Sequence, residues 1–171
     1  MRAIVYTDGA CLGNGTRNAQ AGFGIFWPNK QRYNLYGPLP ANQKQTNNRA
    51  EYMAVLVAIK QAIDYGYDKV IIRTDSNLLI QSLDEYIEKW EDNGWLTSYG
   101  NPVKNQDLIR EIDDLREHEI DVEFEHVRGH TRNYGNEKAD EMAKDGADGD
   151  EDPRGNYRSY YDYIQSLVYM F

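Results

Sequence analysis

Residues 48–75, NRAEYMAVLVAIKQAIDYGYDKVIIRTD, decide the fold because two different hydrophobic patterns follow one another within them. Apolar side chains recur at three- and four-residue steps from Tyr52 to Ile63, which predicts a long, heavily buried helix that ends near Gly66. Residues 69–74 are a short, nearly continuous apolar run, the pattern of a parallel strand covered on both faces. A helix that leads into such a strand indicates the second half of a strand–helix–strand crossover.

The first strand of that crossover is predicted over residues 3–8, AIVYTD, where β-branched and aromatic residues stop at Asp8 and the chain enters a turn. Strands over 21–27 and 32–37 follow at turn-length spacing, which favours an antiparallel meander. Asp75 and Ser76 offer an N-cap for a helix over 76–87, which an irregular protrusion over 88–105 follows. The remaining pattern predicts a helix over 106–117, a strand over 122–127 and a helix over 135–144. We therefore expect an α/β fold with a five-stranded mixed sheet, three antiparallel strands and then two parallel ones, flanked by helices.

The chain has the size of one domain with a tail. Its 171 residues, 40% of them hydrophobic, are enough for one well-buried core, which we place over residues 1–147. Residues 148–171 form the tail. The acidic run DGADGDED, over 145–152, spans the boundary between the domain and the tail and has the composition of a solvated linker. Beyond Pro153, tyrosine and aliphatic residues recur at helical spacing and predict an amphipathic C-terminal helix. We favour docking of this helix onto the domain itself over a partner or dimer interface, and expect a monomer.

Composition excludes several classes of protein. Cys11 is the only cysteine, which rules out an intrachain disulfide and zinc sites built on paired cysteines. The opening MRAIVYTDG is too short an apolar run for a signal peptide or a membrane span, so we expect a soluble, intracellular protein of the cytoplasm or nucleus, not a secreted one. A net charge of −9 argues against a broad basic surface for nucleic acid, so any such binding must be local or metal-assisted. The alternative is that the acidity serves solubility alone.

Asp8, Glu51, Asp75 and Asp140 each lie where a strand is predicted to end or a helix to begin. The crossover brings the first three to one edge of the sheet, where open α/β sheets bind ligands. Carboxylates this close repel one another and need cations between them, and hard divalent cations prefer oxygen ligands. Each residue alone could be a helix cap or a solvated side chain, but the set indicates a metal-dependent phosphoryl-transfer site.

Four segments, in this order and spacing, resemble the type 1 ribonuclease H family, particularly its eukaryotic branch: YTDGACLGNG over 6–15, TNNRAEYMA over 46–54, TDSN over 74–77 and HVRGHTRNYGNEKADEMAK over 126–144. The resemblance runs from about residue 2 to residue 147 and implies the ribonuclease H-like fold. It also implies two Mg²⁺ ions, with Mn²⁺ a possible substitute, and an RNA/DNA hybrid as substrate. In this resemblance Asp8 lies between both metals, Asp140 on the metal that activates water, and Glu51 with Asp75 on the metal that faces the leaving group.

The same resemblance implies further site residues. His130, in a glycine-flanked loop, matches the family histidine that assists proton movement and product release, although a lone histidine is more often structural. Asn14, Asn47 and Asn48 match positions that touch the 2′-hydroxyl, with Cys11 and Glu51 nearby. Lys44, Thr46 and Asn105 match a pocket for a phosphate of the DNA strand. Asn77, Tyr86 and Ser98 complete the expected substrate contacts.

The predicted protrusion departs from the family pattern. Glu91 and Asp92 stand where many members carry lysines, and Tyr86 stands where the family often has tryptophan. Anions in place of cations should make hybrid binding weak and steeply dependent on salt. We expect Trp90 and Trp95 to pack the protrusion onto the body of the domain. This sequence resembles the catalytic domain without the hybrid-binding domain that many eukaryotic relatives carry, so we expect little processive action.

Three functions remain in competition after the sequence alone. The leading one is an endonuclease that hydrolyses the RNA strand of RNA/DNA hybrids and leaves 5′-phosphate and 3′-hydroxyl ends. The second is a nuclease of the same superfamily that acts on another duplex or on a junction, since fold alone does not separate these. The third is a silent nucleic-acid-binding or protein-interaction module, which ranks low because all four carboxylates are present.

Overall fold

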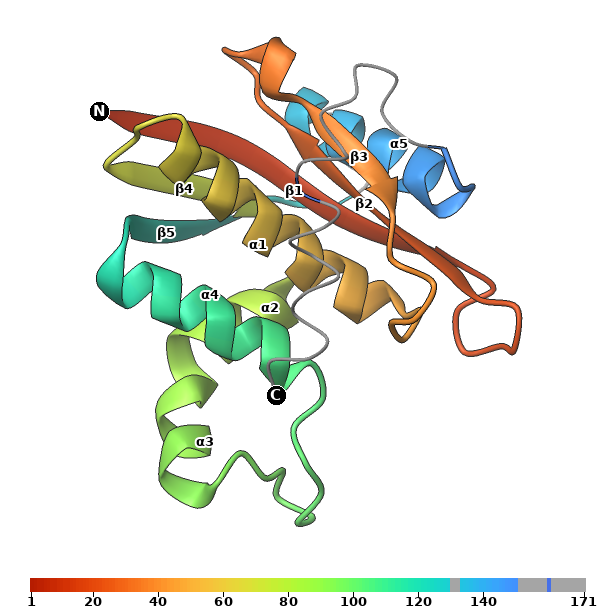
Figure 1. Ribbon diagram of the computed structural model, residues 1–171, viewed down its shortest axis with the longest axis vertical. Helices are drawn as coiled ribbons and strands as arrows, with labels where there is room; N and C mark the ends of the chain where they lie inside the picture. Colours follow the sequence, from red (N-terminus) through yellow and green to blue (C-terminus); the bar gives the residue numbers. More distant parts are fainter. Residues whose placement is uncertain (130–132, 151–159, 161–171) are drawn as a thin grey trace.

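A mixed sheet of five strands, in the order β3-β2-β1-β4-β5, forms the centre of the protein (Figure 1). The structure, a computed structural model, describes residues 1–129, 133–150 and 160. Strands β1 (Arg2–Leu12), β2 (Gln20–Phe26) and β3 (Leu35–Pro38) pair antiparallel, while β4 (Lys69–Thr74) pairs parallel with β1 and β5 (Asp121–His126) pairs parallel with β4. The predicted α/β architecture of three antiparallel and two parallel strands is confirmed.

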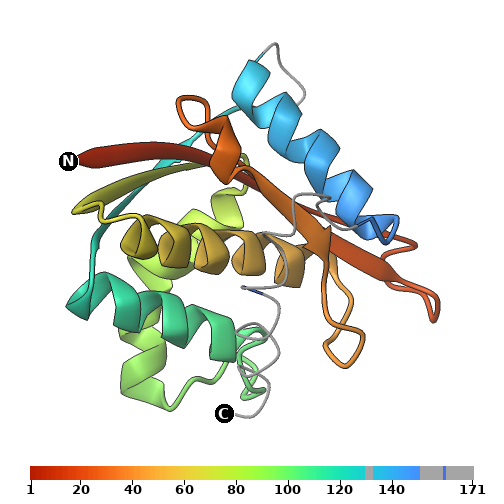
Figure 2. The same ribbon diagram turned by 45° about the horizontal axis from the view of Figure 1, so that its top comes forward.

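Helices cover both faces of this sheet (Figure 2). They are α1 (Asn47–Asp64), α2 (Asn77–Gln81), α3 (Ile87–Asn93), α4 (Gln106–His118) and α5 (Tyr134–Ala147), with a π-helical turn η2 (Ser82–Tyr86) and a 3₁₀ turn η1 (Gln31–Tyr33). Helix α1 lies on one face with α4 packed outside it, and α5 lies on the opposite face. Within the described part of the chain, no helix is both long and apolar enough to cross a membrane.

Helix α1 is the centre of the core. It begins because the Thr46 hydroxyl accepts a hydrogen bond from the Arg49 backbone N–H at 3.1 Å, which satisfies one of the free donors of the first turn. It ends before Gly66, whose φ of +83° suits a residue without a side chain. Met53 and Leu56 are fully buried between these ends. Each such side chain stabilises the fold by about 1.5–3 kcal/mol relative to an exposed one.

Strand β1 does not end at Asp8, and the predicted turn there is wrong. Gly9 continues the strand, since pairing with β2 extends from Tyr6 through Leu12. Gly9 has a different purpose: a Cβ there would lie 2.4 Å from the Glu51 backbone nitrogen, so the glycine lets α1 approach β1 closely. Parallel pairing with β4 stops at Tyr6, which leaves the β4 side of Asp8 open.

Two further predicted elements have different bounds in the structure. The third strand begins at Leu35 because the residues before it form the turn η1. The Asn34 side-chain oxygen accepts a hydrogen bond from the Trp27 backbone N–H at 2.7 Å. The helix predicted over 76–87 continues through η2 and α3 to Asn93, and Gly94 at φ +80° ends it. The remaining helices and strands match their predicted ranges within a few residues.

The two tryptophans of the protrusion pack inward, as predicted. The ring centroids of Trp90 and Trp95 are 5.8 Å apart, and the Arg110 guanidinium of α4 lies 4.4 Å from the Trp95 ring centroid. Trp95 is buried and Trp90 is half-buried. Trp95 therefore packs the protrusion against α4, and Trp90 packs against Trp95.

The C-terminal helix predicted beyond Pro153 lies outside the described residues, apart from Tyr160. The Tyr160 side chain is 8% exposed, and its hydroxyl donates a hydrogen bond to Asp64 Oδ2 at 3.2 Å, at the end of α1. The domain boundary predicted after residue 147 stays a prediction.

Helix α5 lies directly on the backbone of β2. A Cβ at Gly24 would lie 2.4 Å from the Ala139 carbonyl oxygen, and one at Gly22 would lie 2.1 Å from the Ala147 nitrogen. Gly24 is the residue paired with Asp8 across the sheet, and Ala139 precedes Asp140 in α5. The absence of a side chain at Gly24 thus brings Asp140 toward Asp8.

Replacing Gly24 by alanine should push α5 off β2, because the added methyl group meets backbone that cannot move aside independently. We expect the free energy of unfolding to fall by about 1–3 kcal/mol, the usual cost of overpacking. The measurement is urea denaturation, with Gln20→Ala on the exposed start of the same strand as control. Equal unfolding midpoints for the two variants would contradict this account of α5 packing.

Candidate metal centre

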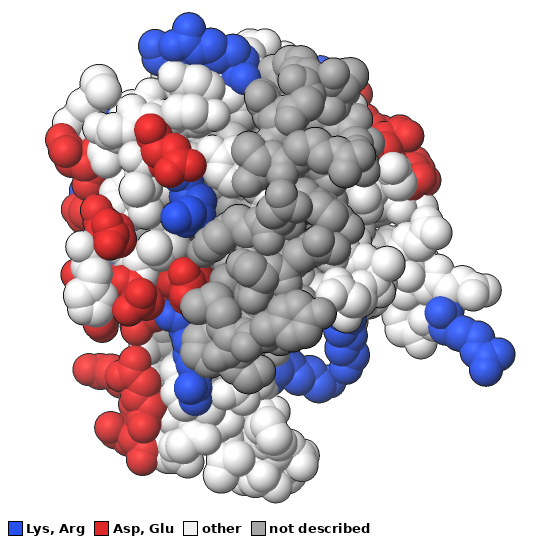
Figure 3. All heavy atoms as spheres, in the orientation of Figure 1, with Lys and Arg blue, Asp and Glu red and all other residues white. Residues whose placement is uncertain are grey.

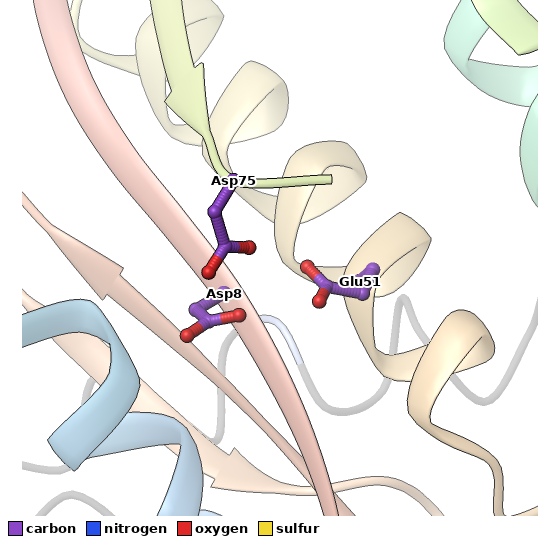
Figure 4. Close-up of side chains that lie close together, drawn as sticks. All are labelled: Asp8, Glu51 and Asp75. Carbon is purple, nitrogen blue, oxygen red and sulfur yellow. The ribbon is translucent and has the colours of Figure 1, made fainter. Parts of the chain in front are cut away.

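Three carboxylates from three elements point toward one another at the middle of the sheet (Figure 4). Asp8 comes from β1, Asp75 directly follows β4, and Glu51 lies one turn into α1. One carboxylate oxygen from each lies within 4.8 Å of the others. The crossover predicted from the sequence therefore brings together these three side chains.

Burial makes the negative charges of this cluster costly. The Asp8 side chain is 4% exposed and that of Glu51 is 7% exposed. Burial, reinforced by the charge of Asp75, raises the pKa of Asp8 to about 8, although the Gly9 N–H donates to Asp8 Oδ1 at 2.8 Å and opposes the shift. Burial also raises the pKa of Glu51 well above its usual range, with Asp8 as the next cause. Without a cation, the raised pKa of Asp8 lets this carboxyl group keep a proton near neutral pH.

The cluster fits a hard divalent cation. Among the described residues, Glu51 Oε2 is buried and has no hydrogen-bond partner, which is costly for a carboxylate oxygen unless a cation contacts it. The three side chains offer only oxygen ligands, which Mg²⁺ and Mn²⁺ accept. Zinc sites in proteins, in contrast, usually include nitrogen or sulfur ligands. The arrangement can thus hold a cation against a phosphate group.

Asp140 lies in the same pocket but is not part of this three-residue group. The pocket, of about 570 Å³, is lined by Asp8, Glu51, Asp75 and Asp140 together with Gly9, Asn47, Asn48, Ser76, Gly129, Asn136 and Glu137. Asp140 Oδ2 forms an ion pair at 2.9 Å with Lys144 Nζ, one turn further along α5. The structure therefore brings the four predicted carboxylates to one pocket and places three of them around one point.

His130 lies outside the described residues, so its predicted role stays a prediction. Gly129 is described and lies close to the cluster, since a Cβ there would come within 2.8 Å of Asp75 Oδ2. The chain segment that leads to residue 130 therefore passes beside the carboxylates.

A second pocket, of about 700 Å³, lies next to the first. It is lined by Asn14, Gly15, Lys44, Thr46, Asn47, Asn48, Arg49, Pro102, Val103, Lys104 and Asn105. Asn47 and Asn48 line both pockets. Asn14 Oδ1 accepts a hydrogen bond from the Asn47 backbone N–H at 3.1 Å, which ties the loop after β1 to the start of α1. The structure thus brings together six of the predicted substrate contacts.

The other predicted contacts lie outside both linings. Cys11 is half-buried with its Sγ 3.5 Å from the Gln45 carbonyl oxygen. Tyr86 is exposed with its ring centroid 5.7 Å from that of Trp90, and Asn77 and Ser98 are exposed. A substrate that contacts all of these positions must extend from the two pockets onto the protrusion.

Sequence reasoning missed Arg49 and Lys104, which line the second pocket. Arg49 stands inside the TNNRAE segment that pointed to the family, but its part in the pocket depends on α4, which is distant in sequence. Glu91 lines a cleft with Asp113, Asp114 and Glu117 of α4. Acidic side chains gather along the side of the molecule where α3 and α4 lie (Figure 3). The weak hybrid binding expected from Glu91 and Asp92 stays a prediction.

The fold is similar to that of a domain in a solved viral protein. The domain of a foamy viral protease-reverse transcriptase, solved in complex with an RNA/DNA hybrid, superposes with a TM-score of 0.70 at 26% identity, over 85% of this chain and 20% of that one. The sheet order and the central carboxylates thus define a ribonuclease H-like domain. The model of the RNase H family matches residues 1–148, and the chain belongs to that family.

Curated relatives agree with this assignment. A ribonuclease H of Schizosaccharomyces pombe is 42% identical over 85% of this chain and 53% of its own length. A ribonuclease H1 of Mus musculus is 40% identical over 87% of this chain and 51% of its own length. The chain spans about half the length of these relatives.

The raised pKa of Asp8 predicts how stability depends on pH when metal is absent. The folded pKa is about 8 and the ordinary value is 3.8, so between these values the folded state keeps a proton that the unfolded chain has lost. Stability of the metal-free protein should therefore fall as pH rises from 5 to 8. We expect Tm in EDTA to drop by at least about 4 °C over this range.

The test compares melting curves of the parent and of Asp8→Asn at both pH values. The variant should lose less stability over the same range because an amide does not titrate. Added Mg²⁺ should raise Tm of the parent at pH 8. Equal pH dependence in the two proteins would contradict the assignment of the proton to Asp8.

Proposed function

We propose that this protein is an endonuclease that hydrolyses the RNA strand of RNA/DNA hybrids and leaves 5′-phosphate and 3′-hydroxyl ends. The observation that carries the proposal is the buried cluster of Asp8, Glu51 and Asp75 in a chain of the RNase H family. Relatives named ribonuclease H and a structural neighbour solved with an RNA/DNA hybrid support the substrate.

Asp8, Glu51 and Asp75 would hold one Mg²⁺ ion, and Asp8 with Asp140 a second, with Mn²⁺ as a possible substitute. When bound, such ions lower the pKa of the attacking water and stabilise the leaving 3′ oxygen of the phosphodiester. Asp140 is available for this role once its surface ion pair with Lys144 opens, which costs little because such pairs are weak.

The neighbouring amides would select the strand to be cut. Asn47 and Asn48 line both pockets, and amide groups can donate to and accept from a 2′-hydroxyl, the group that separates RNA from DNA. Lys44, Thr46 and Asn105 would bind a phosphate of the DNA strand in the second pocket. Hybrid specificity then follows from simultaneous use of both pockets.

The remaining substrate contacts belong to the same proposal. Cys11 and Asn14 would lie beside the RNA strand, while Asn77, Tyr86 and Ser98 would meet the duplex beyond the two pockets. His130 would assist proton movement and release of product. We further propose that the protein acts as a monomer and that its C-terminal segment docks on α1, as the buried Tyr160 supports.

The direct test is cleavage of matched duplexes in Mg²⁺: an RNA/DNA hybrid, double-stranded RNA and double-stranded DNA. We expect the hybrid alone to be cut, with 5′-phosphate ends on the RNA fragments. Asp8→Asn should lower kcat by a factor of about 100 or more, because the amide loses the charge that holds a cation. Preferred cleavage of another duplex, or full activity of Asp8→Asn, would overturn the proposal.

A further inference from the structure

Arg49 is a buried cation at the base of the second pocket. Its side chain is 9% exposed, and its guanidinium donates to three different side chains. Two parallel hydrogen bonds, of 3.0 and 2.7 Å, join it to Asp107 of α4, the paired geometry that suits arginine and not lysine. Nε donates to Gln43 Oε1 at 3.0 Å, and Nη1 also donates to Asn105 Oδ1 at 3.3 Å.

Arg49 contacts two of the three residues proposed to bind phosphate, and a sequence neighbour of the third. The Thr46 hydroxyl accepts from the Arg49 backbone N–H. Lys44 stands between Gln43, which Arg49 contacts, and Gln45, whose Nε2 donates to the Gln43 carbonyl oxygen at 3.0 Å. Asn105 is held directly by the guanidinium. The Arg49 side chain therefore joins the segment before α1, through Gln43, to Asn105 at the start of α4.

The contact with Asn105 also sets which way its amide faces. Arginine can only donate, so the Asn105 side chain must turn Oδ1 toward Arg49, and Nδ2 keeps its two N–H donors for another acceptor. Asn105 has φ of +62°, in the left-handed region, so its backbone too occupies one restricted conformation at the start of α4. An anion meets donors in this orientation, whereas a flipped amide would present an oxygen to it.

Arg49 further neutralises Asp107, whose carboxylate stands two residues after Asn105. Without the guanidinium, that half-buried negative charge would repel a phosphate in the pocket and would lack its paired cation. Orientation of the amide and compensation of charge thus both depend on the same side chain.

We propose that Arg49 is a positioning residue for binding of a DNA-strand phosphate, which it favours without contacting the phosphate itself. It holds Asn105 with its amide donors available and keeps Asp107 neutralised. This inference rests on the proposed function, because it concerns the same hybrid substrate. It adds a buried determinant of duplex discrimination in the lining of the pocket.

The experiment measures hybrid binding by fluorescence anisotropy in the full chain carrying Asp8→Asn, so that cleavage does not interfere. The DNA strand carries one uncharged methylphosphonate, placed at successive positions. In the parent background, neutralising one position should raise Kd by about tenfold, the size of one hydrogen bond to a charged group. With Arg49→Lys added, the unmodified hybrid should bind about tenfold more weakly, and neutralising that position should have no further effect.

Arg116→Lys is the matched control, because Arg116 also pairs with carboxylates of α4 and η2 but lies about 14 Å beyond Asp107 along α4, by the helical rise per residue. It should keep the sensitivity to the single phosphate. If Arg49→Lys is unfolded at the assay temperature, Arg49→Met with Asp107→Leu replaces the pair by apolar side chains, an exchange that buried pairs often tolerate. That double variant should also lose the sensitivity.

The outcomes separate this inference from the proposed function. If the protein with Asp8 intact cuts no hybrid, the proposed function fails. If it cuts hybrid but the Arg49 variants keep the single sensitive phosphate, or no phosphate is sensitive in the parent, the positioning role of Arg49 is wrong.

Discussion

The close approach of α1 to β1 at Gly9 is the constraint on which the site depends. No residue with a side chain fits there, because a Cβ would lie 2.4 Å from the Glu51 nitrogen. The contact fixes Glu51 beside Asp8 before any ligand binds, and the parallel strand β4 then brings Asp75 to the same point. Two of the three carboxylates therefore lie within a strand or helix and the third directly follows a strand, an arrangement that favours precise cation binding.

This geometry has an electrostatic cost that the fold alone does not remove. Three carboxylates share a space in which Asp8 and Glu51 are almost completely buried, and burial raises the pKa of both. Protonation relieves the repulsion in the absence of metal, and a divalent cation relieves it better because it also satisfies Glu51 Oε2. The same groups that destabilise the metal-free protein at high pH thus provide its affinity for cations.

The charged and polar groups of the second pocket are arranged differently from those of the carboxylate cluster. The pocket's polar groups are exposed or half-buried and are neutral or cationic, while the charge of Arg49 is buried and paired with Asp107. The net charge of −9 is compatible with the proposed nucleic-acid substrate, because a few fixed donors and cations would bind it without a broad basic surface. Many of the acids gather elsewhere, along the side formed by α3 and α4.

Sequence patterns predicted the sheet, the buried helix and the carboxylates because these depend on local periodicity and on residue type. They failed at Gly9, since a glycine that permits close packing looks the same in sequence as one that makes a turn. They also missed the π-helical turn at Ser82–Tyr86, which has no distinctive composition, and the pairing of Arg49 with Asp107, which requires knowledge of how α4 packs on α1. Packing between distant segments decides the Gly9 contact and the pairing of Arg49 with Asp107.

The most direct measurement is a crystal structure of the protein soaked in Mn²⁺, with the ions located by their anomalous scattering. Our account predicts a strong peak in contact with carboxylate oxygens of Asp8, Glu51 and Asp75, and a second peak between Asp8 and Asp140. Mn²⁺ bound only at the acidic side chains of α3 and α4, or an empty site among the three buried carboxylates at saturating Mn²⁺, would contradict it.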